Sequence, residues 1–212
     1  MADLNKVFNL DNFGGKSFAE YLDAYSAELN YELLSLLETE DSSTIEAAVV
    51  EPFNEYMKNG GKRHRPLTCI LACLAFDGDV NKCIRPACAI EIFHNSALIH
   101  DDIVDKSELR HGQKCLHQQI GEELAINAGD YGYFYAGKLI MDADNLKKHE
   151  KLDVMKEFTD MELSTAKGQA MDIYWDVNNS FDLASDDYVK MAENKTAFYS
   201  CAIPLVIGAI CA

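Results

Sequence analysis

Long stretches in which apolar residues recur at helical spacing dominate the sequence. One stretch covers residues 18–37, and others cover about 82–106, 119–141, 149–174 and 186–212. Alternating strand patterns are hard to find, and the chain contains only four prolines. Helices of this length pack side by side as a bundle, with any site between them. We therefore predict an all-α fold in which residues 1–212 form a single domain.

Local sequence patterns predict the boundaries of two helices. The segment Ser43–Glu46 has the form of a capping box, which predicts that a helix begins there. Gly60 and Gly61 predict the end of that helix, and Pro66 is typical of the first turn of the next one.

The charge and the cysteines restrict the partners and the location of the protein. The chain carries 19 basic and 35 acidic side chains, a formal net charge of -16, which repels nucleic acid and anionic lipid. Seven cysteines without a CxxC pair indicate thiols in a reducing cytosol. No signal peptide is visible, and the apolar run at 201–212 is shorter than the ~20 residues of a bilayer span. We therefore expect a cytoplasmic protein with no nucleic-acid partner and no transmembrane segment.

The last residues, 200–212, form an apolar helical stripe that stops without a polar cap. Because domain ends are usually exposed and polar, we expect that the chain is truncated inside a helix and that C-terminal helices are missing. The alternative is a short apolar tail that docks on the core.

Three aspartates end the apolar helix predicted near residue 106. Asp101 and Asp105 are four residues apart, where like charges destabilise a helix by roughly 0.2 to 0.5 kcal/mol, and they lie at the negative end of the helix dipole. These two penalties suggest a cation between the carboxylates, and ligands that are all oxygen favour Mg²⁺. Mg²⁺ sites of this kind are completed by phosphates, so we predict a phosphorylated substrate. The alternative is a solvated acidic helix end.

A second cluster concentrates positive charge in this acidic chain. Lys62, Arg63 and Arg65 follow two glycines and precede a helix, which suggests a diphosphate clamp. His94 shares a helix face with Asp101 and Asp105 and is a candidate donor to a phosphate. The alternatives are a basic turn that balances local acid and an ordinary core histidine.

Three weaker features complete the set. Arg110 and His111 follow the aspartates, and Lys195 and Thr196 begin a later apolar stretch. Gln169 and Asp172 project from one face of a predicted helix, where polar groups could reach a bound metal. An ordinary exposed helix face explains Gln169 and Asp172 equally well.

Taken in order, the motifs GGKRHRP, IHDDIVD, LRHG, AINAGD, GQAMDI and NKTAF resemble the motif series of the trans-isoprenyl diphosphate synthases, or polyprenyl synthetases. The resemblance runs from about Gly60 to the last residue. It implies an isoprenoid synthase-type helical bundle with a central cavity, usually dimeric, that uses Mg²⁺. It also implies a prenyltransferase that condenses isopentenyl diphosphate with an allylic diphosphate to make a longer trans-polyprenyl diphosphate.

The resemblance implies roles for individual residues. The expected catalytic residues are Asp101, Asp102, Asp105 and Lys195, and the expected metal ligands are Asp101, Asp105 and Asp172. The expected substrate-binding residues are Gly61, Lys62, Arg65, His94, Arg110, His111, Gln169, Lys195 and Thr196. Phe93, Ser96 and Ala97 precede the aspartates and are expected to set the product length, and Phe93, ~12 Å along the helix from Asp101, suggests a product near geranylgeranyl diphosphate.

Two departures from the family pattern keep alternatives open. Arg110-His111 replaces the paired arginines that are common in the family, and the sequence stops before the second aspartate-rich motif. The chain can therefore be inactive alone, and one alternative is a noncatalytic partner subunit of a complete synthase. Another is a metal-dependent phosphohydrolase built on His64, His100, Asp101 and a later aspartate. A terpene cyclase has no need of the cations Lys62 and Arg65.

Overall fold

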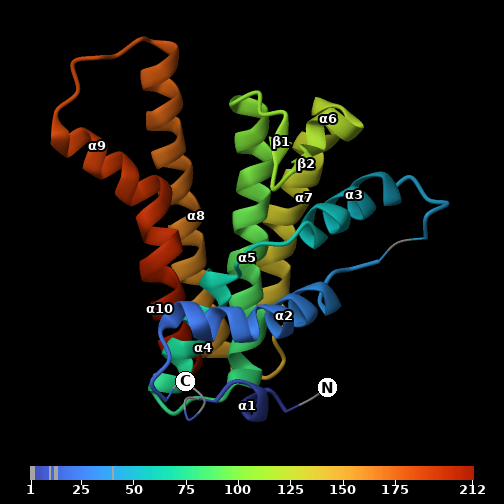
Figure 1. Ribbon diagram of the computed structural model, residues 1–212, viewed down its shortest axis with the longest axis vertical. Helices are drawn as coiled ribbons and strands as arrows, with labels where there is room; N and C mark the ends of the chain where they lie inside the picture. Colours follow the sequence, from blue (N-terminus) through green and yellow to red (C-terminus); the bar gives the residue numbers. More distant parts are fainter. Residues whose placement is uncertain (1–2, 10, 12–13, 40) are drawn as a thin grey trace.

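The computed structural model describes residues 3–9, 11, 14–39 and 41–212, and within them helices dominate (Figure 1). The helices are α1 (Leu4–Val7), α2 (Phe18–Ser35), α3 (Ala47–Lys58), α4 (His64–Ala75), α5 (Val80–Val104), α6 (Leu116–Ile120), α7 (Glu122–Met141), α8 (Lys148–Val177), α9 (Ser185–Ala192), the π-helical segment η2 (Glu193–Ala202) and α10 (Ile203–Cys211). The all-α prediction is confirmed. A small antiparallel hairpin, β1 (Leu109–Arg110) and β2 (Gln113–Lys114), was not predicted.

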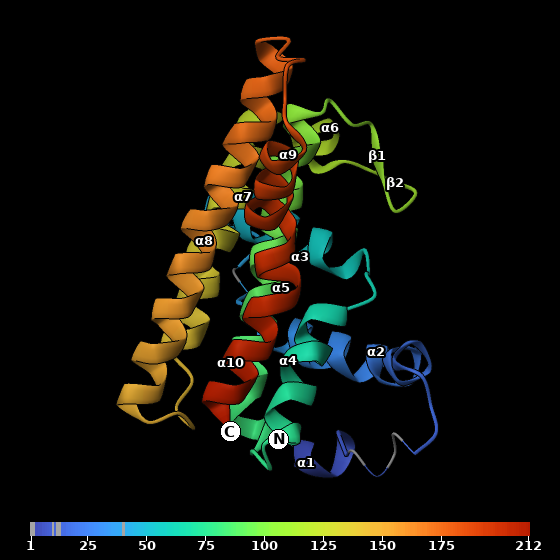
Figure 2. The same ribbon diagram turned by 90° about the vertical axis from the view of Figure 1, so that its left-hand side faces the viewer.

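Helices α5, α7 and α8 and the run from α9 to α10 stand roughly upright, while α2 lies across them (Figures 1 and 2). Helix α7 packs along one side of α5, while α8 pairs with the continuous run of α9, η2 and α10. At the lower end, α10 packs closely on α4 and also contacts α5. Towards the upper end, the pair formed by α8 and α9 diverges from the pair formed by α5 and α7, and this is where the aspartate end of α5 lies (Figure 1).

Two predicted boundaries need correction. The capping box at Ser43–Glu46 is wrong, because Glu46 is the N-cap of α3 and makes no side-chain cap bond. The Ser42 hydroxyl instead donates to Glu51, and the Thr44 hydroxyl donates to the carbonyl of Asp41. The predicted helix 119–141 is divided at Gly121 into α6 and α7. The helix end at Gly60 and the place of Pro66 in the first turn of α4 are confirmed.

At two glycines, the backbone of α7 lies directly against side chains of α5. A Cβ atom at Gly132 would lie 2.1 Å from the Ser96 hydroxyl and 2.4 Å from the Phe53 ring. A Cβ atom at Gly129 would lie 2.4 Å from Nε2 of His100. This face of α7 continues in small residues that are fully buried, Ala125, Ala128 and Ala136. The small residues let α5 approach α7 closely, which fixes the position of its aspartate end.

The C-terminal helical run Ser185–Cys211 passes a length and composition test for a membrane span, the single described helix to do so. Its most apolar window has a mean hydropathy of 1.2, and 39% of that window is buried in the structure. A core helix of a water-soluble protein passes the same test, and Ile203, Ile207 and Cys211 are fully buried. The expectation of no transmembrane segment stays a prediction.

Replacing Gly132 with alanine is expected to lower the free energy of unfolding by about 1–3 kcal/mol, because the new methyl group overpacks against Ser96 and Phe53. Chemical denaturation measures this change. Gly137→Ala, on the same helix, is the matched control, since its new Cβ atom would meet only Met155 at 3.8 Å. The control is expected to gain up to about 1 kcal/mol from helix propensity. Equal stability of the two variants would contradict the close contact.

Candidate active site

A cavity of about 670 Å³ lies between α5, α7, α8 and η2. Its apolar walls include Phe93, Ala97 and Leu98 from α5 and Ile173 from α8. Its polar lining includes Asp101, Gln169, Lys195 and Thr196, which the sequence analysis selected as site residues. The cavity therefore combines room for an apolar chain with a cluster of charged groups.

The charged groups of this cluster come from three separate elements. The Gln169 side-chain amide, on α8, donates to Oδ1 of Asp101, on α5, at 2.8 Å. Nζ of Lys195, on η2, lies 2.5 Å from Oδ2 of Asp172 and 4.0 Å from Oδ1 of Asp101. Residues from three separate segments of the sequence are thus brought together, as the motif series implies.

Contact between two backbones holds Lys195 in this cluster. A Cβ atom at Gly168 would lie 2.2 Å from the backbone nitrogen of Lys195 and 2.7 Å from the carbonyl carbon of Asn194. Only a glycine lets α8 approach η2 this closely, and Gly168 directly precedes Gln169. The sequence analysis did not select Gly168, although the GQ pair in GQAMDI points to it.

The carboxylates fit a hard divalent cation. Burial raises the pKa of Asp105, and the nearby Asp101 carboxylate raises it further. A cation between these groups would relieve that repulsion, and oxygen ligands suit such an ion. Among the described residues, no group of three or more histidine, cysteine or acidic side chains is arranged to hold a metal ion. Mg²⁺ sites built on one or two carboxylates usually take their other oxygen ligands from water and phosphate.

Asp102 faces away from this cluster. Its side chain is 1% exposed, and its Oδ1 accepts hydrogen bonds from Nε and Nη2 of Arg110 at 2.8 and 2.6 Å. One residue along a helix turns a side chain by about 100°, so Asp102 cannot share the face of Asp101. Asp102 therefore fixes the hairpin that carries Arg110 and His111.

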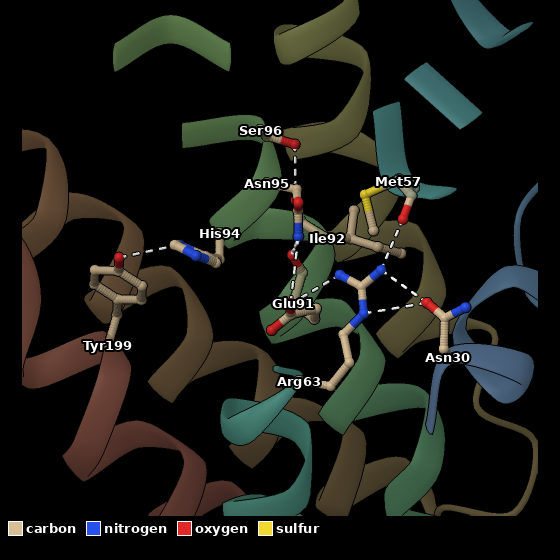
Figure 3. Close-up of polar contacts among 9 residues, drawn as sticks. All are labelled: Asn30, Met57, Arg63, Glu91, Ile92, His94, Asn95, Ser96 and Tyr199. Carbon is tan, nitrogen blue, oxygen red and sulfur yellow. Dashed lines mark hydrogen bonds and ion pairs between the residues drawn. The ribbon is translucent and has the colours of Figure 1, made fainter. Parts of the chain in front are cut away.

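The basic cluster is joined to η2 through Tyr199 and Ser200. The Arg65 guanidinium is buried, donates to the Ser200 hydroxyl at 2.9 and 3.1 Å, and lies 4.9 Å from the centre of the Tyr199 ring. The Tyr199 hydroxyl lies 3.1 Å from Nδ1 of His94, as the dashed line in Figure 3 shows. Lys62 lies nearby in sequence and is exposed.

His94 is a neutral side chain in this environment. Burial, followed by the positive charge of Arg65, lowers its pKa to about 2. When the Tyr199 hydroxyl donates to Nδ1, the proton of the neutral ring sits on Nε2, which can then donate to a ligand. The sequence analysis did not select Tyr199. Its position four residues after Lys195 is the pattern that could have identified it as a neighbour of the site.

The remaining predicted residues divide between the cavity and other places. Phe93 and Ala97 line the cavity. The centre of the Phe93 ring lies 5.9 Å from the centres of the Phe158 and Tyr199 rings. Ser96 instead donates to the carbonyl of Ile92 at the contact with α7, so it does not line this cavity. A separate small cavity of about 10 Å³ lies between the loop at Gly60 and the hairpin, lined by Arg110 and His111. Gly61 follows Gly60 in that loop and is exposed.

This fold and site define a class, an all-α protein with a large apolar cavity, a carboxylate cluster at the cavity and a separate basic cluster. The sequence pattern of the polyprenyl synthetase family matches residues 46–212, which is most of the chain. The chain therefore belongs to the polyprenyl synthetase family, and the resemblance stated from its motifs is confirmed.

Named relatives and solved structures agree with this assignment. A geranylgeranyl diphosphate synthase of Saccharolobus solfataricus is 37% identical over 69% of this chain and 44% of its own length. An octaprenyl diphosphate synthase of Escherichia coli is 28% identical over 80% of this chain and 53% of its own. The crystal structure of a geranylgeranyl pyrophosphate synthetase from Pyrococcus horikoshii superimposes with a TM-score of 0.82, at 26% identity, over 92% of this chain and 57% of that one. The chain thus spans about half the length of these relatives.

Glu162 is a further carboxyl group that lines the cavity, and burial raises its pKa to about 7. Because the unfolded chain loses this proton near pH 4.5, the folded state binds the proton more tightly. Stability is therefore expected to fall as the pH rises from about 4.5 through 7. Glu162→Gln should remove this loss, so the variant should be more stable than the parent at pH 8 and equal to it near pH 4.5. Thermal melts across this range measure the difference.

Asp153→Asn, which changes an exposed carboxylate of α8, is the control and should give the same difference from the parent at every pH. A Glu162→Gln profile parallel to that of the parent would show that this carboxyl group is not buried against the cavity.

Proposed function

We propose that the chain is a Mg²⁺-dependent prenyltransferase that condenses isopentenyl diphosphate with an allylic prenyl diphosphate to make a longer trans-polyprenyl diphosphate. One observation carries the proposal: carboxylates and Lys195 meet at one apolar cavity, while a second cluster of cations lies on the other side of Tyr199. Two diphosphate groups and one apolar tail match these three features.

The allylic diphosphate is assigned to the carboxylate side. Asp101, Asp105 and Asp172 would supply carboxylate oxygens to Mg²⁺ there, together with water and the phosphate oxygens, and Lys195, Thr196 and Gln169 would hold the diphosphate. A metal bound there would supply charge neutralisation for the leaving diphosphate. Lys195 adds a fixed positive charge beside Asp172, and the apolar walls keep water away from the cationic carbon.

Isopentenyl diphosphate is assigned to the basic side. Lys62 and Arg65 supply positive charge, His94 supplies an Nε2–H donor, and the hairpin supplies Arg110 and His111. Gly61 directly precedes Lys62, and without a Cβ atom it lets the backbone approach the ligand closely. Because Arg65 is bonded to Ser200 in this structure, ligand binding replaces or supplements that contact. Asp102 acts through Arg110, so we assign it a positioning role rather than a catalytic one.

The product length is assigned to the end of the cavity. Phe93 packs against Phe158 and Tyr199 and limits the space for the growing chain, with Ala97 beside it. We propose a product near geranylgeranyl diphosphate. The position of Ser96 against Gly132 gives it only an indirect part, through the spacing of α5 and α7.

We also propose a cytoplasmic homodimer. All seven cysteines are free thiols in the structure, which suits a reducing compartment. The exposed large apolar side chains of α7 include Ile126 at 42%, Phe134 at 80% and Met141 at 49% exposure, which suits a helix that packs against a second copy. No contact with nucleic acid is part of the proposal.

The direct test incubates the purified 212-residue protein with Mg²⁺, farnesyl diphosphate and labelled isopentenyl diphosphate, and then sizes the extracted products. Geranylgeranyl diphosphate is expected, and Asp101→Asn should lower the rate by about 10²–10³-fold through loss of charge stabilisation. Asp144→Asn, on an exposed loop carboxylate, should leave the rate unchanged.

Two outcomes would contradict the proposal. Release of phosphate without incorporation of isopentenyl diphosphate would indicate a phosphohydrolase. Absence of product from the chain alone, together with a changed product from a complete synthase to which the chain is added, would indicate a noncatalytic subunit.

A further inference from the structure

Arg63 is buried although it stands between the exposed Lys62 and the half-buried His64. Its side chain is 1% exposed, and its backbone is left-handed, with φ of 52°. This conformation is sterically unfavourable for a residue with a Cβ atom. It turns the Arg63 side chain inward at the start of α4, so an interaction inside the protein must stabilise it.

The Arg63 guanidinium binds three elements at once (Figure 3). Nη1 lies 3.0 Å from Oε1 of Glu91 on α5. Nη2 donates to the carbonyl of Met57 on α3 at 2.7 Å and to the Asn30 side chain on α2 at 2.9 Å. Gly61 lies over the pair, since a Cβ atom there would be 3.3 Å from Nη1 of Arg63.

Glu91 is equally buried and is held by its own helix. Glu91 is 3% exposed, and the Asn95 side-chain amide donates to the backbone carbonyl of Glu91 at 2.8 Å. Oε2 of Glu91 is buried and has no partner among the described residues. Replacing such a buried ion pair with apolar residues of similar volume is often neutral or stabilising, so stability alone does not explain it.

The geometry explains the pair as a positional constraint. Glu91 and His94 are three residues apart on α5, while Arg63 lies between Lys62 and Arg65 on the loop. A planar guanidinium with partners on three sides fixes the position and rotation of that loop, which a point charge does not. The pair therefore sets the cations of the loop against the imidazole of α5.

We propose that Arg63 and Glu91 are positioning residues whose buried ion pair orients residues 61–65 against α5 and so forms the binding site for isopentenyl diphosphate. The ligand named here rests on the proposed function, whereas the ordering of the loop does not.

The test compares the parent with the double variant Arg63→Met/Glu91→Leu, which replaces the pair with apolar volume and leaves no unpaired charge. Its melting temperature is expected to equal or exceed that of the parent. Isopentenyl diphosphate is expected to bind about 10-fold more weakly by calorimetry, while the Mg²⁺-dependent binding of farnesyl thiodiphosphate stays unchanged. The single variant Arg63→Lys should also bind isopentenyl diphosphate more weakly than the parent, because one ammonium group cannot satisfy three partners.

A second readout needs no ligand. A lysine-specific protease should cut after Lys62 at least several-fold faster in the double variant, relative to peptides of residues 58–68 that carry each sequence. Lys138→Gln/Asp142→Asn, which removes exposed ion pairs at the end of α7, is the control and should leave both readouts unchanged.

The two readouts separate the ordering of the loop from the binding of isopentenyl diphosphate. Parent-like cleavage after Lys62 in a folded double variant would overturn the proposal, as would parent-like binding of isopentenyl diphosphate. If the parent does not bind isopentenyl diphosphate, the proposed function fails, and the cleavage rate still decides whether the pair orders the loop.

Discussion

The close contact of α5 with α7 is the constraint on which the rest of the structure depends. Gly129 and Gly132 let α7 meet side chains of α5 without a Cβ atom between them, and this contact holds α5 at His100 and Ser96. Helix α5 then presents Glu91 and His94 near its middle and Asp101 near its end. One rigid helix therefore sets the distance between the basic cluster and the carboxylate cluster.

The segment η2 links the two clusters from the opposite side. Lys195 reaches Asp172 and Asp101, while Tyr199 and Ser200 reach His94 and Arg65. The π-helical winding places these groups along one short stretch, and such windings are frequent at functional sites. The same stretch lines the apolar cavity with Tyr199 and Thr196. Both charged clusters and the cavity therefore depend on how η2 packs on α8 at Gly168.

The helical fold and the membership of the carboxylate cluster could be predicted because they leave local patterns. Helical spacing of apolar residues, the aspartates at a helix end and the ordered motifs each identify residues directly. The directions of side chains could not be predicted in the same way. Asp102 faces Arg110, Ser96 faces Gly132, and Arg63 turns inward, because packing between helices decides each orientation. The false capping box at Ser43–Glu46 arose for a related reason, since Ser42 and Thr44 bond elsewhere.

The central claim is that the chain carries two diphosphate sites of opposite charge, one built on carboxylates and one on cations. Calorimetric titration of the whole chain with farnesyl thiodiphosphate and with isopentenyl diphosphate, each with and without Mg²⁺, tests it most directly. The account predicts two independent sites, with Mg²⁺ required for the allylic analogue and not for isopentenyl diphosphate. Competition of both ligands for one site, or a Mg²⁺ requirement for isopentenyl diphosphate, would contradict it.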